Sequence, residues 1–319
     1  MAHVPDQDSD PVAAALSGSI DLYDVAEWEP RSALDGFSVR LYGALHASRR
    51  WLLIALAVLL FVAQLAATVL LAIRRPELGV LAALSVVPAL AIVGYLWYGD
   101  PTMREPLEPL AVTFVLAILF ASIAALVNTL LQPLFQFVPV VGMAVFFFVV
   151  VGPIEETVKW LAIRVGGYGT IDAVVDGVVY GAVAGLGFAT IENALYISQG
   201  YTQAASAQNG DPIVAALQTA TSRAFVGPGH VLYSSFAGYY LGLAKFNPDD
   251  AGPIVVKGIV VAALIHAVYN TSVTYLPALL PWNTVVFVGF VVAFDAAVGY
   301  LLYRKLRRYR DHYERATNA

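Results

Sequence analysis

The sequence predicts an all-α polytopic membrane protein with about eight transmembrane helices, preceded by an acidic N-terminal tail. Of its 319 residues, 59% are hydrophobic and 13% are charged, whereas a typical soluble domain has about 25% charged residues. Apolar runs of about 20 residues, long enough to cross a bilayer core of about 30 Å, recur along the chain. Charged residues, prolines and glycines separate these runs, which is the pattern of successive spans.

Three regions follow from this pattern. Residues 1–48 are expected to form a disordered cytoplasmic tail, because the first 35 residues hold eight acidic side chains and one arginine. Residues 49–305 are expected to form the transmembrane domain, in which residues 152–272 carry the informative motifs. Residues 306–319 are expected to form a basic cytoplasmic tail that lies on the membrane surface.

The eight predicted spans are bounded by charge, proline or glycine. In order, they cover residues 51–73, 78–98, 107–131, 140–165, 171–197, 222–244, 254–276 and 283–303. The first lies between the arginine pairs at 49–50 and 74–75, and the second ends before the loop that carries Arg104. The third follows this loop, and the fourth contains "GPIEETVKW" and ends at Arg164.

The last four spans differ in what joins them. The fifth carries Gly177, Gly181 and Gly185, a four-residue spacing that lets membrane helices approach closely. A polar loop at 198–222 then follows, either as a connector with a short surface helix at 212–220 or as a segment that shapes access to a site. The sixth and seventh spans are separated by a loop between two lysines, and "RKLRRYRDHYER" follows the eighth.

Lysine and arginine near the span ends set the expected orientation. Most of them fall on the side of the two termini, which an even number of spans places together. We therefore predict a multi-pass plasma-membrane protein with cytoplasmic termini. Arg74, Arg75 and Arg223 fall on the opposite side.

Ionisable residues inside a span are costly unless they are paired or hydrated, so each one is a candidate for function. The spans contain Glu155, Glu156, Lys159, Asp176, Glu192, His230, His266 and Asp295. With a rise of about 1.5 Å per residue, four of these from four different spans reach similar depths in the outer half of the membrane. We predict that these four, Glu155, Glu192, His230 and His266, meet in one cavity.

The remaining ionisable residues have structural interpretations. Lys159 and Asp176 lie at matching depths near the cytoplasmic side, which predicts a salt bridge between their spans, with an intrahelical pair of Glu155 and Lys159 as the alternative. Asp295 lies in the middle of the eighth span without an evident partner, and its role stays open.

The two adjacent glutamates point about 100° apart around a helix. One should therefore face the cavity, and the other should turn to a neighbouring helix. We expect Glu155 to act as the general base that takes a proton from water. His266 and Asn270 are one helical turn apart and could donate hydrogen bonds to a developing oxyanion.

Two further residues are expected to support this chemistry. His230 lies in "GPGHVLYSS", whose glycines and proline are expected to loosen the helix beside a hydrated cavity. Glu192 is expected to be a metal ligand, a residue that orients a ligand, or the partner of a histidine.

Four motifs follow one another along the sequence, namely "EETVK", "FATIENALY", "GPGHVLY" and "HAVYN". In this order they make the sequence resemble the PrsW family of intramembrane proteases, and more distantly the CAAX-processing and bacteriocin-processing endopeptidases. The resemblance implies an active site made by Glu155, Glu156, Glu192, His230, His266 and Asn270. It also implies a membrane-anchored protein substrate and a protease conventionally described as a metalloprotease.

The spacing of the motifs leaves the metal open. There is no HExxH motif, but Glu192, His230 and His266 with a water molecule would suit a zinc ion. Without metal, Glu155 would be the base and His230 would orient it or carry its proton. The oligomeric state is not predicted.

The same residues are compatible with other functions to different degrees. A secondary transporter could use the carboxylates and histidines as a proton relay, but the inverted repeats and paired broken helices of transporters are not evident. A membrane scaffold with an inactive site is a third interpretation. A serine mechanism at Ser234 or Ser235 lacks a supporting base and orienting residue, and an aspartyl mechanism at Asp176 or Asp295 lacks the expected glycines. The chain has no cysteine, which excludes thiol proteases, and nothing resembles a nucleic-acid surface.

Overall fold

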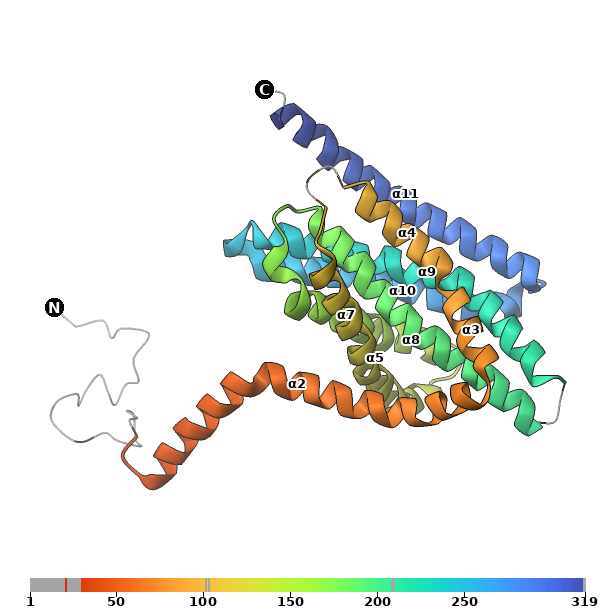
Figure 1. Cartoon of the computed structure of the whole chain (residues 1–319), viewed down its shortest axis with the longest axis horizontal. Helices are drawn as coiled ribbons and strands as arrows, with labels where there is room; N and C mark the ends of the chain where they lie inside the picture. Colours follow the sequence, from red (N-terminus) through yellow and green to blue (C-terminus); the bar gives the residue numbers. More distant parts are fainter. Residues whose placement is uncertain (1–20, 22–29, 101, 103, 208–209, 318–319) are drawn as a thin grey trace. The chain divides into compact units, whose positions relative to one another are not determined.

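The computed structural model describes residues 21, 30–100, 102, 104–207 and 210–317. The part of the chain that it describes contains helices and no strand, in agreement with the predicted all-α class (Figure 1). The chain divides into two compact units, Met1–Leu53 and Ile54–Ala319. The predicted disorder of residues 1–20 and 22–29 lies outside the described residues.

The first described helix is α2, which covers Ala33–Arg74. It begins before the predicted span, so residues 33–48 of the predicted tail are helical. Ser32 and Asp35 fix this start by reciprocal capping, in which the Ser32 N–H donates to Asp35 Oδ2 at 2.7 Å and the Asp35 N–H donates to Ser32 Oγ at 3.1 Å.

The second and fourth predicted spans are each divided. The second consists of α3 (Pro76–Ser85) and α4 (Val87–Tyr98), because Pro88 has no N–H to continue the helical hydrogen bonds across Val86. The fourth consists of α6 (Gly142–Phe146), the π-helical turn η1 (Phe147–Val151) and α7 (Gly152–Gly166). Such π turns interrupt α-helices frequently at functional sites.

The other predicted spans are longer helices than expected. They are α5 (Leu107–Gln136), α8 (Asp176–Ala207), α9 (Pro212–Lys245), α10 (Ala251–Leu279) and α11 (Thr284–Thr317), with short 3₁₀ turns η2 (Tyr168–Thr170) and η3 (Pro248–Asp250) between them. The predicted long loop at 198–222 is wrong. Most of it is helical, and the expected surface helix at 212–220 is the first part of α9, which Asp211 caps by accepting from the Ile213 N–H at 2.8 Å.

Within the described residues, five helical segments are long and apolar enough to cross a membrane, and a shorter apolar stretch covers Trp51–Val62. The five are Pro76–Tyr98, Leu107–Gln136, Asp176–Ala207, Pro248–Leu279 and Thr284–Arg315. The chain is therefore a polytopic helical membrane protein, and the total of eight spans stays a prediction.

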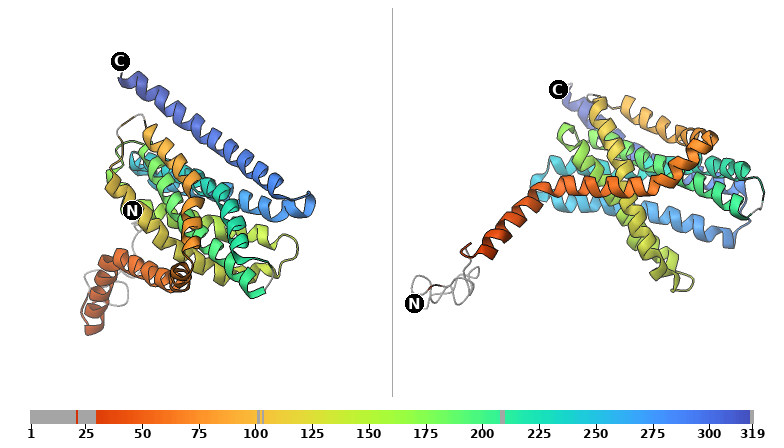
Figure 2. Two further views of the ribbon diagram at one scale, coloured as in Figure 1. Left: turned by 45° about the vertical axis from the view of Figure 1, so that its right-hand side comes forward. Right: turned by 60° about the horizontal axis from the view of Figure 1, so that its bottom comes forward.

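The pair α8 and α9 forms the centre of the second unit, and the two helices lie side by side (Figure 2). The predicted glycine contact is confirmed. A Cβ atom added to Gly181 would lie 2.3 Å from the Ser234 carbonyl oxygen on α9, and one added to Gly185 would lie 2.3 Å from that of His230. Only a residue without a side chain allows the two backbones to touch in this way.

Around this pair, α10 packs on α9 and α7, while α5 packs on α7 and α8. The start of α7 also lies directly against α10, since a Cβ atom on Gly152 would lie 2.6 Å from the Ala263 carbonyl oxygen. Gly152 is three residues before Glu155, and Ala263 is three residues before His266. This contact therefore brings the two functional candidates together.

Candidate active site

A cavity of about 630 Å³ lies among α5, α7, α8, α9 and α10. Its lining includes five of the six residues predicted for the active site, namely Glu155, Glu192, His230, His266 and Asn270. The sixth, Glu156, is completely buried behind the cavity wall. A cavity of this size is typical of ligand and substrate sites.

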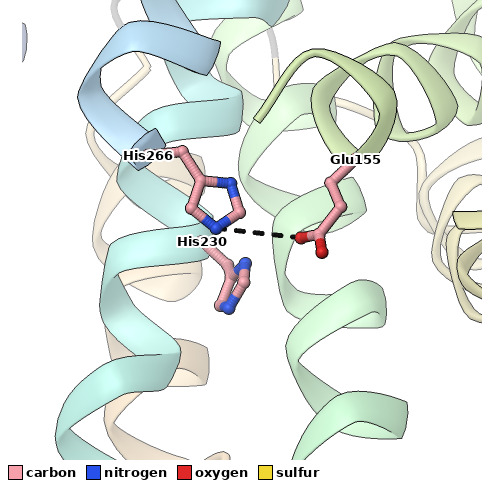
Figure 3. A group of neighbouring side chains, drawn as sticks. All are labelled: Glu155, His230 and His266. Atoms are coloured by element: carbon pink, nitrogen blue, oxygen red, sulfur yellow. Dashed lines mark ion pairs between the residues drawn. The ribbon is translucent and has the colours of Figure 1, made fainter. Parts of the chain in front are cut away.

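Three of the predicted side chains converge from α7, α9 and α10 (Figure 3). Glu155, His230 and His266 each offer one ligand atom, and these atoms lie within 4.8 Å of one another. The nearest carboxylate oxygen of Glu155 is 3.7 Å from His266 Nε2. The two imidazole rings are edge to face with their centroids 5.2 Å apart. These side chains line one cavity together with Glu192, as predicted, and their depth in the membrane stays a prediction.

Glu155 is held through one of its two carboxylate oxygens. Asn128 on α5 donates from Nδ2 to Glu155 Oε1 at 3.0 Å. The other oxygen, Oε2, is buried and has no hydrogen-bond partner among the described residues. A buried acceptor of this kind is uncommon, and it is available to a water molecule, a substrate group or a cation.

Glu156 turns away from the cavity, as predicted for one of the two glutamates. Its Oε1 accepts from Lys159 Nζ at 2.6 Å and from His266 Nδ1 at 3.0 Å. Its Oε2 accepts from Ser234 Oγ at 3.0 Å. This carboxylate therefore ties α7 to α9 and α10 and fixes the ring of His266.

The predicted salt bridge between Lys159 and Asp176 is wrong. Lys159 is completely buried and pairs within its own helix with Glu156, three residues before it. Asp176 instead accepts from the N–H groups of Asp172 and Ala173, both at 2.7 Å, and from the Thr102 hydroxyl at 3.2 Å. Equal depth in two spans does not require that the two side chains point toward each other.

The hydrogen bonds define where the imidazole protons lie. His266 Nδ1 donates to the Glu156 carboxylate, so the lone pair of Nε2 faces the cavity. For His230 the arrangement is reversed, because the Lys159 ammonium donates to Nδ1 at 3.1 Å. His230 Nε2 then carries the proton and faces Glu192 Oε2 at 2.9 Å.

Glu192 is the partner of a histidine, one of the three predicted roles. Its Oε2 also accepts from the Arg223 guanidinium at 2.5 Å. Arg223 Nε donates to Asn193 Oδ1 at 2.8 Å, and Asn193 Nδ2 donates to Ser85 Oγ at 3.0 Å. A polar network from α3 thus reaches the cavity through Arg223.

Two residues of the site were missed by the sequence reasoning. Asn128 lies inside an apolar span, but a search for ionisable groups passes over a neutral amide. Arg223 was interpreted only as a charge near a span end. A search that included every amide and every arginine within reach of a span would have found both.

The "GPG" segment, which is expected to loosen the helix, lies inside α9 and does not interrupt it. The α9 helix continues through Gly227, Pro228 and Gly229. Proline removes a single N–H, and the neighbouring helices of a membrane bundle support the helix around it.

The serine and aspartyl alternatives do not fit this geometry. Ser234 and Ser235 are completely buried, and their hydroxyls donate to Glu156 and to the Val231 carbonyl at 2.7 Å. Asp295 lines a separate cavity next to α4 and α11. Neither arrangement offers a nucleophile or a carboxylate pair to the cavity.

The residues present fit a zinc ion in donor type. Zinc binds histidine nitrogens and carboxylate oxygens at about 2.0–2.2 Å, usually in a tetrahedral arrangement. His266 offers an Nε2 lone pair, Glu155 offers its unpartnered Oε2, and His230 would offer Nε2 in the tautomer that carries the ring proton on Nδ1, the nitrogen that now accepts from Lys159. Among the described residues, the possible ligand atoms that lie within 4.8 Å of one another come from Glu155, His230 and His266. The predicted ligand Glu192 is not part of this group.

Comparisons with known proteins place the chain among intramembrane metalloproteases. Residues 105–297 match the family described as PrsW family intramembrane metalloprotease. The chain is 30% identical over 197 residues to "Protease PrsW" of Bacillus subtilis (strain 168), which covers 60% of this chain and 81% of that protein. It is 29% identical over 201 residues to "Protease PrsW" of Clostridioides difficile (strain 630), covering 59% of this chain and 76% of that protein. No solved structure matches the chain significantly.

Proposed function

Because the chain belongs to the PrsW family of intramembrane metalloproteases, we propose that Glu155 activates a water molecule for peptide-bond hydrolysis in the cavity that His230 and His266 share. The observation that supports this proposal most directly is that Glu155 Oε2 has no hydrogen-bond partner among the described residues and lies 3.7 Å from His266 Nε2. The transporter alternative is not favoured, since the family and the relatives are peptidases.

Glu155 is assigned as the base because the other two glutamates of the site are already engaged. Glu156 accepts from Lys159, His266 and Ser234, and Glu192 accepts from Arg223. The Oε2 atom of Glu155 is free to take a proton, and it lies beside His266 in the cavity. A positioned general base typically contributes about 10²–10⁴-fold to the rate.

The metal of this family is proposed to be zinc. His230 and His266 would hold it, and the Glu156 carboxylate on Nδ1 of His266 is the kind of partner that orients a metal-binding imidazole. When bound, zinc would act as a Lewis acid on the scissile carbonyl oxygen. The hydrogen bond to Glu156 also argues against neutral His266 as an oxyanion donor, since its remaining nitrogen carries no proton.

Asn270 is the proposed oxyanion donor, because it lines the cavity one helical turn after His266. Glu192 is proposed to hold His230 through Nε2 before zinc binds, because the metal would then take this nitrogen, and Arg223 is proposed to hold Glu192. The proposed substrates are membrane-anchored proteins whose cleaved bond reaches the cavity from the bilayer. The proposed location is the plasma membrane with both termini in the cytoplasm, which rests on the distribution of lysine and arginine.

The test separates the base from the metal ligands. Glu155→Gln is expected to reduce cleavage of co-expressed membrane-tethered reporters by about 10²–10⁴-fold while the purified protein keeps its zinc. His266→Ala should lose both the activity and the zinc, measured by elemental analysis. Glu108→Gln removes an exposed carboxylate elsewhere on the fold and should change neither. Unchanged cleavage by Glu155→Gln would refute the proposed base, and loss of zinc from that variant would make Glu155 a ligand.

A further inference from the structure

A further pocket lies along the last part of α11, and it shares no lining residue with the active-site cavity. The apolar stretch of the helix ends at Tyr303, and the next residues are basic. A pocket of about 510 Å³ lies here, lined by Tyr239 of α9 and by Leu301, Arg304, Lys305, Arg308, Tyr309 and His312 of α11. It therefore lies at the boundary between the apolar and the polar part of a membrane-spanning helix.

The charge of this pocket is positive. It contains Arg304, Lys305 and Arg308, and no acidic side chain of the described residues lines it. Arg304, Arg308 and His312 are spaced by four residues, so they share one face of α11. Like charges at this spacing repel each other, and a bound anion would relieve the repulsion.

The neighbouring face of α11 shows a different arrangement. Arg307 and Arg310 line another cavity together with Asp100 and Asp311, so acidic groups balance the arginines there. Arg310 also donates to the Gly99 carbonyl at 2.5 Å. The basic pocket is thus the part of the helix whose cations lack acidic neighbours within the lining described here.

The pocket combines its cations with apolar and aromatic walls. Lys305 Nζ lies 4.3 Å from the centre of the Tyr239 ring and donates to the Tyr240 hydroxyl at 3.4 Å. Leu301, which belongs to the apolar stretch of α11, also lines the pocket. A ligand that matches these walls carries a negative group beside a hydrocarbon chain.

We propose that this pocket binds an anionic phospholipid, with the phosphate between Arg304 and Arg308 and the first part of an acyl chain beside Leu301. Arginine suits the phosphate, because its guanidinium donates in a fork that matches two oxygens. Anionic lipids concentrate at basic segments next to a transmembrane helix. The proposal does not depend on the catalytic site.

The experiment counts bound lipids on the detergent-purified full chain by native mass spectrometry. Phosphatidylglycerol and phosphatidylcholine with the same acyl chains are titrated separately. Wild type is expected to bind phosphatidylglycerol at least about tenfold more tightly, since each basic residue near the surface contributes measurably. Arg304→Gln with Arg308→Gln should weaken phosphatidylglycerol binding by about tenfold or more and leave phosphatidylcholine unchanged. If this pair does not yield folded protein, Arg308→Gln alone is used.

The matched control is Arg307→Gln with Arg315→Gln, which removes the same charge from the same helix outside the pocket. It should keep the wild-type affinity for phosphatidylglycerol. Equal losses in the two double variants would overturn the proposal, because they would show a general attraction without a site. Equal displacement of the lipid by inorganic phosphate would also overturn it, because the acyl chain would then contribute nothing.

Discussion

At the scale of single residues, the orientation of Glu155 and of His266 depends on the hydrogen bonds that two neighbouring side chains make to them. Asn128 holds one oxygen of Glu155, and Glu156 holds one nitrogen of His266. In each case the outward atom, Glu155 Oε2 or His266 Nε2, is left to the cavity. Positioning of this kind is a large part of what a catalytic site needs, because a misplaced group loses most of its effect.

Asn128→Leu should lower kcat/KM by about 10–100-fold, the usual effect of removing a partner that orients a functional group. Thermal stability should change little, because the lost hydrogen bond to Glu155 Oε1 is offset in part by the removal of Asn128 Oδ1, which is buried without a hydrogen-bond partner. Cleavage rates and melting temperatures in detergent give the two readouts. Thr129→Val is the control, since its hydroxyl donates to the Ala125 carbonyl and not to Glu155. Wild-type activity in Asn128→Leu would contradict the positioning role.

The pair of Glu156 and Lys159 should separate stability from activity. Glu156→Leu leaves the fully buried Lys159 ammonium without its carboxylate, which should destabilise the protein by about 3–5 kcal/mol. Adding Lys159→Met removes the second charge and should reverse most of the decrease in melting temperature. Activity should stay low in the double variant, because His266 Nδ1 still lacks its acceptor. Recovery of both quantities together would show that Glu156 has only a structural role.

The sequence predicted the residues that carry charge in the spans and the meeting of four of them, because burial of charge leaves few alternatives. It did not predict the partners. Helical periodicity gives the angle between Glu155 and Glu156, but not which helix lies on each side. That is why Lys159 was paired with Asp176 instead of with Glu156.

At the scale of helices, the contact between α8 and α9 places Glu192 beside His230. The carbonyl of His230 itself lies against Gly185, so α9 is positioned by direct backbone contact with α8. The sequence predicted the contact from glycine spacing alone. It did not predict the length of the two helices, because polar residues at 198–222 are as compatible with a helix beyond the apolar region as with a loop.

Gly181→Ala should destabilise the protein by about 1–3 kcal/mol, the typical cost of inserting a methyl group into a closed interface. The new Cβ atom would lie 2.3 Å from the Ser234 carbonyl oxygen, and the two helices would have to separate. Activity should fall as well, since Ser234 also donates to Glu156. Gly94→Ala in α4 is the control, because nothing lies within 4 Å of its added Cβ atom. Equal melting temperatures of the two variants would contradict the close contact.

At the scale of the whole second unit, acidic residues connect the loop after α4 with the start of α8, and Arg310 connects this loop with the last part of α11. Asp100 accepts from the Thr102 hydroxyl at 2.7 Å, and this hydroxyl also contacts Asp176. Glu105 is 5% exposed and lies between two apolar segments. Burial raises the pKa of Glu105 to about 7, with a further contribution from the negative charge of Asp176 and Asp100.

This pKa predicts how stability depends on pH. A carboxyl whose pKa is raised from 4.5 to about 7 on folding contributes stability that is complete below about pH 4.5 and is lost as the pH rises through 7. Glu105→Gln should therefore melt at a higher temperature than wild type at about pH 8, and the difference should be smaller at about pH 5. Glu108→Gln, at an exposed glutamate three residues later, controls for the change of net charge. A difference that is the same at both pH values would contradict the raised pKa.

The π-helical turn at Phe147–Val151 determines which acid reaches the cavity. A π turn holds about one residue more than an α turn. Deleting one residue there, with α6 kept in place, would rotate all that follows by about 100°. Glu156 would then point in the direction that Glu155 has now, and Glu155 would point in the direction of Ile154. This π turn of apolar residues therefore fixes the rotation of α7 about its axis. That rotation determines which of two neighbouring and chemically identical glutamates faces the cavity.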